Sequence, residues 1–332
     1  AFGVVLITTK TGHVKDNIRV SYKNNFSWSQ ATSLPEYPNV PTQVQGLIDD
    51  NYRKGNAAEL FGMYMDSEEF QAGIHNWIAK HGDTKAGYRE MIYGDDYDKY
   101  GYYANWDVGG IMFSKHAPAQ SHNISVTGNS GRTNYYVSFG YNQRQGLQNF
   151  NPDKIRRYNA AANISLQATD WLTVGTRISY IDRTYDGVSN RQNYGNAGYQ
   201  YLWRWGSFFG PYGYFVNPDD GQAYDARTMI GYRKQGGERM RHMNNLRMTG
   251  FLKIDLSHGF TFNGDYTFIR KNTKYRDVGL IPNLYNTWGL APTAPSNCGT
   301  TSDWLETDHS VYQNQVFNGY FNYNQTFNEA HN

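Results

Sequence analysis

The amino-acid sequence predicts an all-β fold, a transmembrane antiparallel β-barrel, and three observations predict it. Apolar and polar residues alternate with a period of two in eight segments, each close to the roughly ten residues that a tilted membrane strand needs. Short and long connections alternate between these segments. Aromatic residues gather near both ends of the segments. Each observation fits a barrel whose outer wall faces lipid and whose inner wall faces water.

Composition excludes several other classes of protein. The longest apolar run has four residues, Val4 to Ile7, far short of the roughly 20 that a membrane-spanning helix needs. The mean hydropathy is polar, which a barrel tolerates because lipid-facing residues alternate with polar ones. A net charge of +2 and the lack of a dense Lys/Arg run with interleaved aromatics argue against nucleic-acid binding. A single cysteine, Cys298, allows no intrachain disulfide.

The alternation places Arg and Lys on the polar side of the first, fifth and sixth expected strands. In the first strand Ile18, Val20 and Tyr22 share a face, and Arg19 and Lys23 lie on the other. A charge on the lipid side near the bilayer centre would cost about 2–4 kcal/mol, so a membrane barrel requires this separation. A soluble β-sandwich also alternates. The expected strands span residues 18–28, 121–129, 133–143, 156–168, 171–182, 245–256, 259–270 and 315–327.

The connections separate the barrel from the sandwich. Short turns are expected at 128–131, 169–170 and 257–258, and the connections between them span 29–120, 144–155, 183–244 and 271–314. Outer-membrane barrels have short periplasmic turns and long extracellular loops, whereas a sandwich has no reason to keep its long loops at one end. The loop 29–120 is expected to contain helices at 42–54 and 66–80, because apolar residues there recur at helical spacing.

Aromatic side chains are expected to form a girdle at each membrane interface. The periplasmic girdle would contain Trp171, Phe260 and Phe327, and the outer one Trp28, Tyr141, Tyr158, Tyr180 and Phe268. The last residues, 328–332, fall in a periplasmic turn by this register. We therefore expect a ninth strand to follow and the barrel to be larger than these eight strands.

Three stretches carry distinctive motifs, AFGVVLITTKTG at 1–12, APAQSHNISVTG at 117–128 and TNYYVSFGY at 133–141. They resemble motifs of the SusC/RagA family of TonB-linked outer-membrane transporters. Residues 1–12 are similar to the last plug strand of that family, A-x-G-V-I-x-I-T-T-K-x-G. Residues 117–128, APAQSHNISVTG, resemble its A-P-x-Q-x-H-N-x-S-V-S-G stretch, and residues 133–141, TNYYVSFGY, resemble its T-x-Y-Y-x-S-x-G-Y strand. Residues 105–107, Asn-Trp-Asp, depart in order from the family's N-x-D-W.

The resemblance implies a specific organisation and function. Residues 1–12 would be the last strand of a plug domain, and residues 13–332 the first part of a barrel with about 22 strands. The complete protein would import oligosaccharides or oligopeptides across the outer membrane of a Gram-negative, Bacteroidota-like bacterium. Its partners would be a SusD-like lipoprotein, outer-membrane lipid and the TonB complex, which would engage a TonB box upstream of this sequence. The alternatives are a passive porin and a small outer-membrane barrel that acts as an enzyme or adhesin.

The candidate ligand-binding residues form an aromatic cluster in the loop 183–244. Flat apolar rings with polar edges suit stacking on sugar rings or packing on peptide side chains. The alternative is that the rings pack the loop against itself or against the lipoprotein. The cluster comprises Tyr199, Tyr201, Trp203, Trp205, Phe208, Phe209, Tyr212 and Tyr214.

No pattern in the sequence predicts catalysis or a bound metal. The sequence contains no G-x-S-x-G, H-E-x-x-H or P-loop motif. The acidic turns at 95–98 and 219–220 lack the ligand spacing of a calcium loop. We therefore expect no enzyme activity, no metal site and no cofactor.

Overall fold

The computed structural model describes most of the expected barrel segments. It describes residues 18–34, 40–56, 59–60, 63–64, 68–85, 105, 107–189, 214–216, 223–225, 229–281, 284–285, 295–296 and 302–325. The expected plug strand at 1–12, Phe327 and the acidic turns at 95–98 and 219–220 lie outside these residues. The proposed boundary between plug and barrel lies outside them too.

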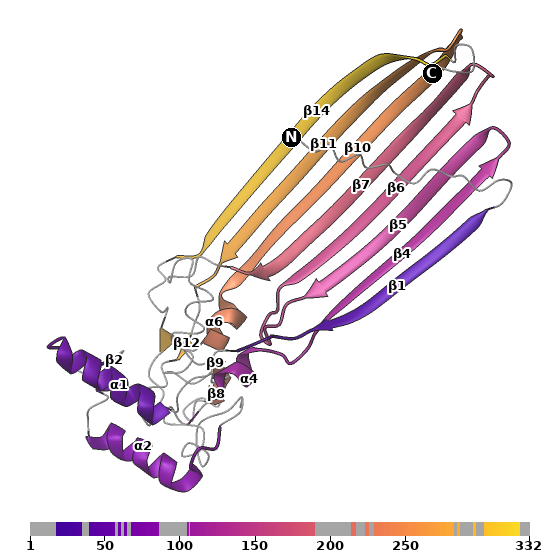
Figure 1. Cartoon of the computed structure of the whole chain (residues 1–332). Coiled ribbons are helices and arrows are strands. Elements are labelled where there is room, and N and C mark those ends of the chain that lie inside the picture. The colour runs from indigo at the N-terminus through magenta and orange to yellow at the C-terminus, as the bar shows by residue number, and fades with distance from the viewer. Residues whose placement is uncertain are drawn as a thin grey trace.

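One open antiparallel sheet of eight strands dominates the described structure (Figure 1). Each strand pairs with its neighbour along the chain, in the order β1-β4-β5-β6-β7-β10-β11-β14. β1 and β14 are the two edges, so the sheet does not close on itself. This confirms the predicted fold class, an antiparallel sheet that forms part of a barrel. The strands are β1 (Arg19–Ser29), β4 (Ala117–Ser130), β5 (Thr133–Gln145), β6 (Lys154–Gln167), β7 (Leu172–Val188), β10 (Gly237–Ser257), β11 (Phe260–Gly279) and β14 (Trp304–Tyr323).

The smaller elements gather at the end of the sheet where the long connections lie (Figure 1). The opposite end carries tight turns, including Gly131-Arg132 and His258-Gly259. Among the described residues, none of the helices combines the length and apolar character that crossing a membrane requires. The smaller elements are α1 (Val40–Arg53), α2 (Glu68–His81), α4 (Val108–Met112), α6 (Met229–Gln235), and the strand pairs β2 (Glu59–Leu60) with β3 (Met63–Tyr64), β8 (Tyr214–Val216) with β9 (Ala223–Asp225), and β12 (Leu284–Tyr285) with β13 (Pro295–Ser296).

Several strands extend further towards the long connections than the sequence predicted. β10 begins at Gly237 rather than at residue 245, and β14 begins at Trp304 rather than at 315. β11 ends at Gly279 rather than at 270. In these extensions both faces carry polar residues, as in the run Arg239-Met-Arg-His242. The period-two signal is therefore weak there, although the backbone ladder continues without interruption.

Cross-strand register places the apolar residues of all eight strands on one face, which we call the apolar face. Ile18, Leu166, Leu252 and Phe321 on this face are 69%, 41%, 36% and 67% exposed. Such exposure contradicts a soluble sandwich, which buries its apolar face against a second sheet. Members of the apolar face include Tyr22, Ile124, Phe139, Leu166, Ile178, Leu252, Tyr266 and Phe321.

Aromatic rings pair across strands on the apolar face. Tyr141 and Tyr158 lie directly opposite each other, with ring centroids 5.0 Å apart. At the short-turn end, the Phe260 and Tyr323 centroids are 4.6 Å apart. These pairs include residues expected in both girdles, and tilted rings at such distances attract each other beyond the effect of buried area.

Among the described residues, the buried apolar ones lie outside the sheet, at its long-connection end, except for Ala117 at the start of β4. Ile111 and Met112 of α4 are 4% and 1% exposed, and Ile74 and Trp77 of α2 are each 3% exposed. Ile48 of α1 is also buried. The helices expected at 42–54 and 66–80 are present as α1 and α2, and each buries part of its apolar stripe.

Candidate functional site

The opposite side of the sheet, which we call the polar face, carries hydroxyl, amide and guanidinium groups. Thr249 on β10 and Thr267 on β11 are directly opposite, and their hydroxyls form a buried hydrogen bond of 2.9 Å. Asn318 on β14 donates to the Asp265 carboxylate at 3.1 Å. Such cross-strand bonds satisfy polar groups that would otherwise lose hydration. Members of the polar face include Ser125, Ser138, Asn163, Arg177, Thr249, Thr267 and Asn318.

An aromatic ring also lies on the polar face. The Arg177 guanidinium is 4.4 Å from the centroid of Phe251. Phe251 is directly opposite Gly175, whose missing side chain leaves the space that the ring occupies. The guanidinium plane on the ring adds a cation–π attraction and fixes where the Arg177 charge is held.

A cavity of about 570 Å³ lies on the polar face, lined by residues of β5, β6, β7, β10 and β11. Its volume lies within the range of about 300–1,000 Å³ typical of ligand pockets. Three arginines and one lysine line it, namely Arg144, Arg157, Arg183 and Lys271, together with Ile155, Ile181 and polar residues that include Asn142 and Thr273. We call these four side chains the basic cluster. They come from β5, β6, β7 and β11.

The connection between β5 and β6 is held by hydrogen bonds to two helices, α6 and α4. Arg233 of α6 donates from Nε to the Phe150 carbonyl at 2.7 Å and from Nη2 to the Asn151 carbonyl at 2.9 Å. Asn151 returns a bond from Nδ2 to the Arg233 carbonyl at 2.6 Å. On the other side, Asn149 donates from Nδ2 to the Ile111 carbonyl of α4 at 2.7 Å. The connection between β5 and β6 is thus held between α6 and α4.

The motif residues Asn105 and Asp107 have structural roles. Asp107 precedes α4 and accepts a hydrogen bond from the Gly110 amide at 3.1 Å, which caps the helix. Asn105 is buried and donates to the Asp83 carbonyl at 3.4 Å. The segment that departs from the family order therefore anchors the loop structure around α4.

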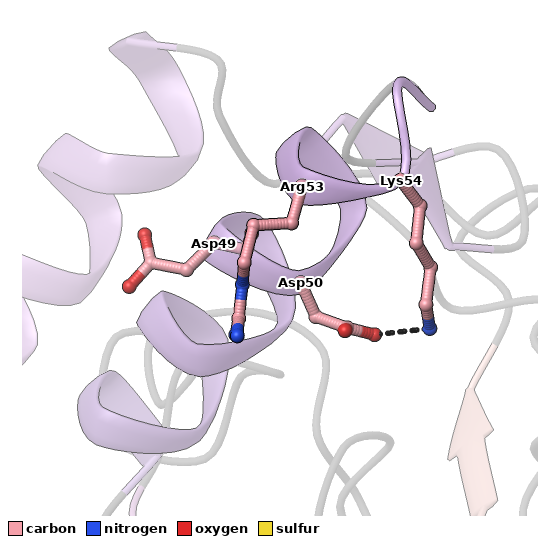
Figure 2. Close-up of polar contacts among 4 residues, drawn as sticks. All are labelled: Asp49, Asp50, Arg53 and Lys54. Atoms are coloured by element: carbon pink, nitrogen blue, oxygen red, sulfur yellow. Dashed lines mark hydrogen bonds and ion pairs between the residues drawn. The ribbon is translucent and has the colours of Figure 1, made fainter.

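Helix α1 carries a charged group on its exposed surface (Figure 2). The Lys54 ammonium is 2.5 Å from the Asp50 carboxylate, one helical turn away, and Gln45 donates to Asp49 at 2.9 Å. The hydrogen bond from Lys54 holds the pKa of Asp50 below its usual value. The pairing is therefore present at neutral pH and is lost as the pH falls through that lowered pKa. Such pairs stabilise a helix surface, and we assign them no binding role.

The predicted aromatic cluster is not tested by the described structure. Tyr199, Tyr201, Trp203, Trp205, Phe208, Phe209 and Tyr212 lie outside the described residues. Tyr214 is the first residue of β8, where its backbone is paired with Asp225. The role of this cluster in ligand binding stays a prediction.

The sequence did not reveal the basic cluster. Arg144, Arg183 and Lys271 lie beyond the expected ends of their strands, at 143, 182 and 270. If the alternation of each expected strand is continued to these residues, all three side chains fall on the polar face. Their proximity also depends on register between strands, as in the direct pairing of Arg157 with Arg183.

Comparison with solved structures identifies chains of similar fold. A chain described as the RagAB peptide transporter is 17% identical, with a TM-score of 0.61 over 97% of this chain and 34% of that chain. A chain of the RagAB peptide importer in its closed-closed state is 16% identical, with a TM-score of 0.59 over 96% of this chain and 34% of that chain. In the open-open state the identity is 18% and the TM-score 0.51, over 83% of this chain and 30% of that chain. No family model and no curated protein matches the sequence. This chain spans about a third of the length of those solved chains, and the likeness shows that its sheet has the fold of part of a transporter β-barrel.

Proposed function

We propose that this chain is the first part of the barrel of a SusC/RagA-like, TonB-dependent outer-membrane importer. The observation that carries the proposal is an exposed apolar face on a sheet that superimposes on RagAB chains over nearly its whole length. In this arrangement the apolar face contacts outer-membrane lipid and the polar face lines the aqueous interior. The resemblance of residues 1–12 to a plug strand and of residues 117–141 to a barrel segment adds independent support.

The chemistry of this function is binding and gating, with no bond made or broken. A ligand would bind from outside, and the TonB complex would pull on the plug through a TonB box upstream of this sequence. A SusD-like lipoprotein would cover the extracellular opening. The solved chains of similar fold are described as parts of a peptide importer, which favours oligopeptides over oligosaccharides as the ligand.

Uptake by cells that express the full-length gene tests this function. We expect cells to accumulate a fluorescent oligopeptide, and a gene deletion to abolish the accumulation. A protonophore should also abolish it, because the TonB complex draws its energy from the proton gradient. A fluorescent oligosaccharide, assayed in parallel, decides between the two ligand classes.

The alternatives give different results in the same assay. Uptake that persists after protonophore treatment would select a passive porin. Absence of gene-dependent uptake of either probe would select an outer-membrane barrel with another role, such as an adhesin. Recovery of the protein in the soluble fraction without detergent would contradict a membrane barrel altogether.

A further inference from the structure

The basic cluster brings like charges together without neutralising them. Arg157 and Arg183 are directly opposite on neighbouring strands, and direct cross-strand partners have Cβ atoms about 4.5–5.5 Å apart. Arg144 lies diagonally across from Arg157, since its direct partner is Ile155. Like charges in direct opposition destabilise a sheet. The described residues that line the cavity include no aspartate or glutamate to offset them.

Two other arginines of these strands and turns have acidic partners. Arg156, the neighbour of Arg157 on the apolar side of β6, pairs with Asp186 at 2.7 Å. Arg132, in the turn between β4 and β5, pairs with Asp170 at 2.9 Å. Within the described part of the chain, no ion pair joins Arg144, Arg157 or Arg183 to a carboxylate. The three guanidinium groups at the cavity therefore differ from Arg156 and Arg132 in having no acidic partner among the described residues.

The form of the cavity suits an anionic ligand with a peptide backbone. Guanidinium groups recognise carboxylates through paired N–H donors, and they do so with greater geometric specificity than an ammonium group. Asn142 and Thr273 can bond to amide groups, and Ile155 and Ile181 provide apolar contact. The lining residues Arg144 and Ile155 lie near the long-connection ends of β5 and β6, and the long connections are on the side from which an imported ligand would enter.

We infer that the basic cluster binds the carboxylates of an acidic oligopeptide during import. This inference rests on the proposed function and deepens it, because it names the chemical class of peptide that the transporter prefers. The side-chain carboxylates of the peptide would replace the missing acidic partners of Arg157 and Arg183. Binding would weaken with added salt, as for exposed charge pairs.

Direct binding to the purified full-length protein tests the inference. The probes are an oligopeptide that contains glutamates and its counterpart in which every glutamate is glutamine, both amidated at the C-terminus and carrying a neutral fluorophore. We expect the wild-type protein to prefer the glutamate peptide. The double variant Arg157→Gln/Arg183→Gln should bind that peptide about tenfold more weakly for each lost charged contact, with little change for the glutamine peptide.

A matched double variant, Arg156→Gln/Arg270→Gln, controls for the loss of two positive charges. Both residues lie on the apolar side of their strands, and this variant should keep the preference for the glutamate peptide. Arg183→Lys should also keep much of the preference, because it retains the charge. Elution volume and tryptophan fluorescence identify a variant that has failed to fold. If the double variant fails to fold, the preference for the glutamate peptide is compared between Arg183→Lys and Arg183→Gln, and only Arg183→Gln should lose it.

The outcomes separate this inference from the proposed function. Equal weakening of both peptides, or no change in either, would overturn the inference, since the cluster would then serve to balance charge elsewhere in the protein. Wild-type protein that binds both peptides equally well would also overturn it while leaving peptide import intact. Wild-type protein that binds neither peptide would contradict the proposed peptide import itself, and this inference with it.

Discussion

At the scale of single residues, Gly175 on β7 leaves room on the polar face for the ring of Phe251 on β10. A Cβ at Gly175 would collide with the Phe251 ring and would stand 2.5 Å from the backbone carbonyl oxygen of Ile164. The ring can move, but the carbonyl belongs to the ladder between β6 and β7 and cannot yield easily. Because Gly175 has no side chain, the Phe251 ring has room at this position. The ring in turn holds the Arg177 guanidinium in place.

Replacing this glycine should therefore destabilise the sheet. We expect Gly175→Ala to lower the free energy of unfolding by about 1–3 kcal/mol, the usual cost of overpacking. Urea unfolding of the full-length protein in lipid vesicles, followed by tryptophan fluorescence, measures the change. Gly250→Ala is the matched control, because nothing lies within 4 Å of a Cβ there, and it should be neutral or slightly stabilising. Equal losses in the two variants would show that space beside Phe251 is not the reason for Gly175.

The sequence alone could not reveal this contact. Gly175 and Phe251 are opposite only because β7 and β10 pair in one particular register across a long connection. A shift of one residue would turn every side chain of β10 to the other face. The alternation within each strand predicts which of its sides is apolar. The cross-strand partner of each residue depends on the register, which the sequence does not show.

At the scale of strands, the sequence predicted which side of each strand is apolar, because that signal is local. Ile164 and Ser165 on β6 illustrate it. Ile164 pairs with Tyr135 and Thr176 on the apolar face and is 39% exposed, whereas Ser165 faces the other way. The strand ends were less predictable. Beyond the roughly ten residues that a bilayer requires, no lipid enforces alternation, so the extensions that carry much of the basic cluster have no periodic signature.

A charge introduced on either side of β6 distinguishes the two faces. We expect Ile164→Lys to lower the free energy of unfolding in vesicles by about 2–4 kcal/mol, because the ammonium would face hydrocarbon. Ser165→Lys, one residue along, should cost little, because its side chain would face water. Urea titrations of the two variants provide the comparison. Similar costs for both would mean that the apolar face does not contact lipid, and the membrane assignment would be wrong.

At the scale of the whole molecule, the alternation of short and long connections follows from the meander order of the sheet. Every strand pairs with the next in the chain, so successive connections fall at opposite ends. Helices and small strands then share the long-connection end (Figure 1). The basic cluster lies on β5, β6, β7 and β11, and the proposed ligand entry side is at that same end. The sequence predicted this arrangement because loop length is visible directly. It could not predict where the aromatic residues of the loop 183–244 lie, since no periodic pattern fixes their contacts.

The open edges of the sheet lead to a test of barrel size. β11 and β14 are neighbours, and the Tyr266 and Phe317 ring centroids are 4.6 Å apart. β1 and β14 are the two edges. In a barrel larger than eight strands, further strands separate these edges, whereas a closed eight-stranded barrel would pair them. A disulfide forms only when the two Cα atoms are within about 7 Å, so cysteine pairs report which strands are adjacent.

In the full-length protein with Cys298→Ser, we expect Tyr266→Cys/Phe317→Cys to form a disulfide under mild oxidation. Phe317→Cys combined in turn with Val20→Cys, Tyr22→Cys and Phe26→Cys should form none, because these three positions on the apolar side of β1 would lie far from β14 in a larger barrel. Gel mobility with and without reductant measures the cross-link. A disulfide between β1 and β14 in any of the three variants would mean that eight strands close the barrel. Such a barrel has an interior filled by side chains, with no room for a plug, and import through it would be ruled out.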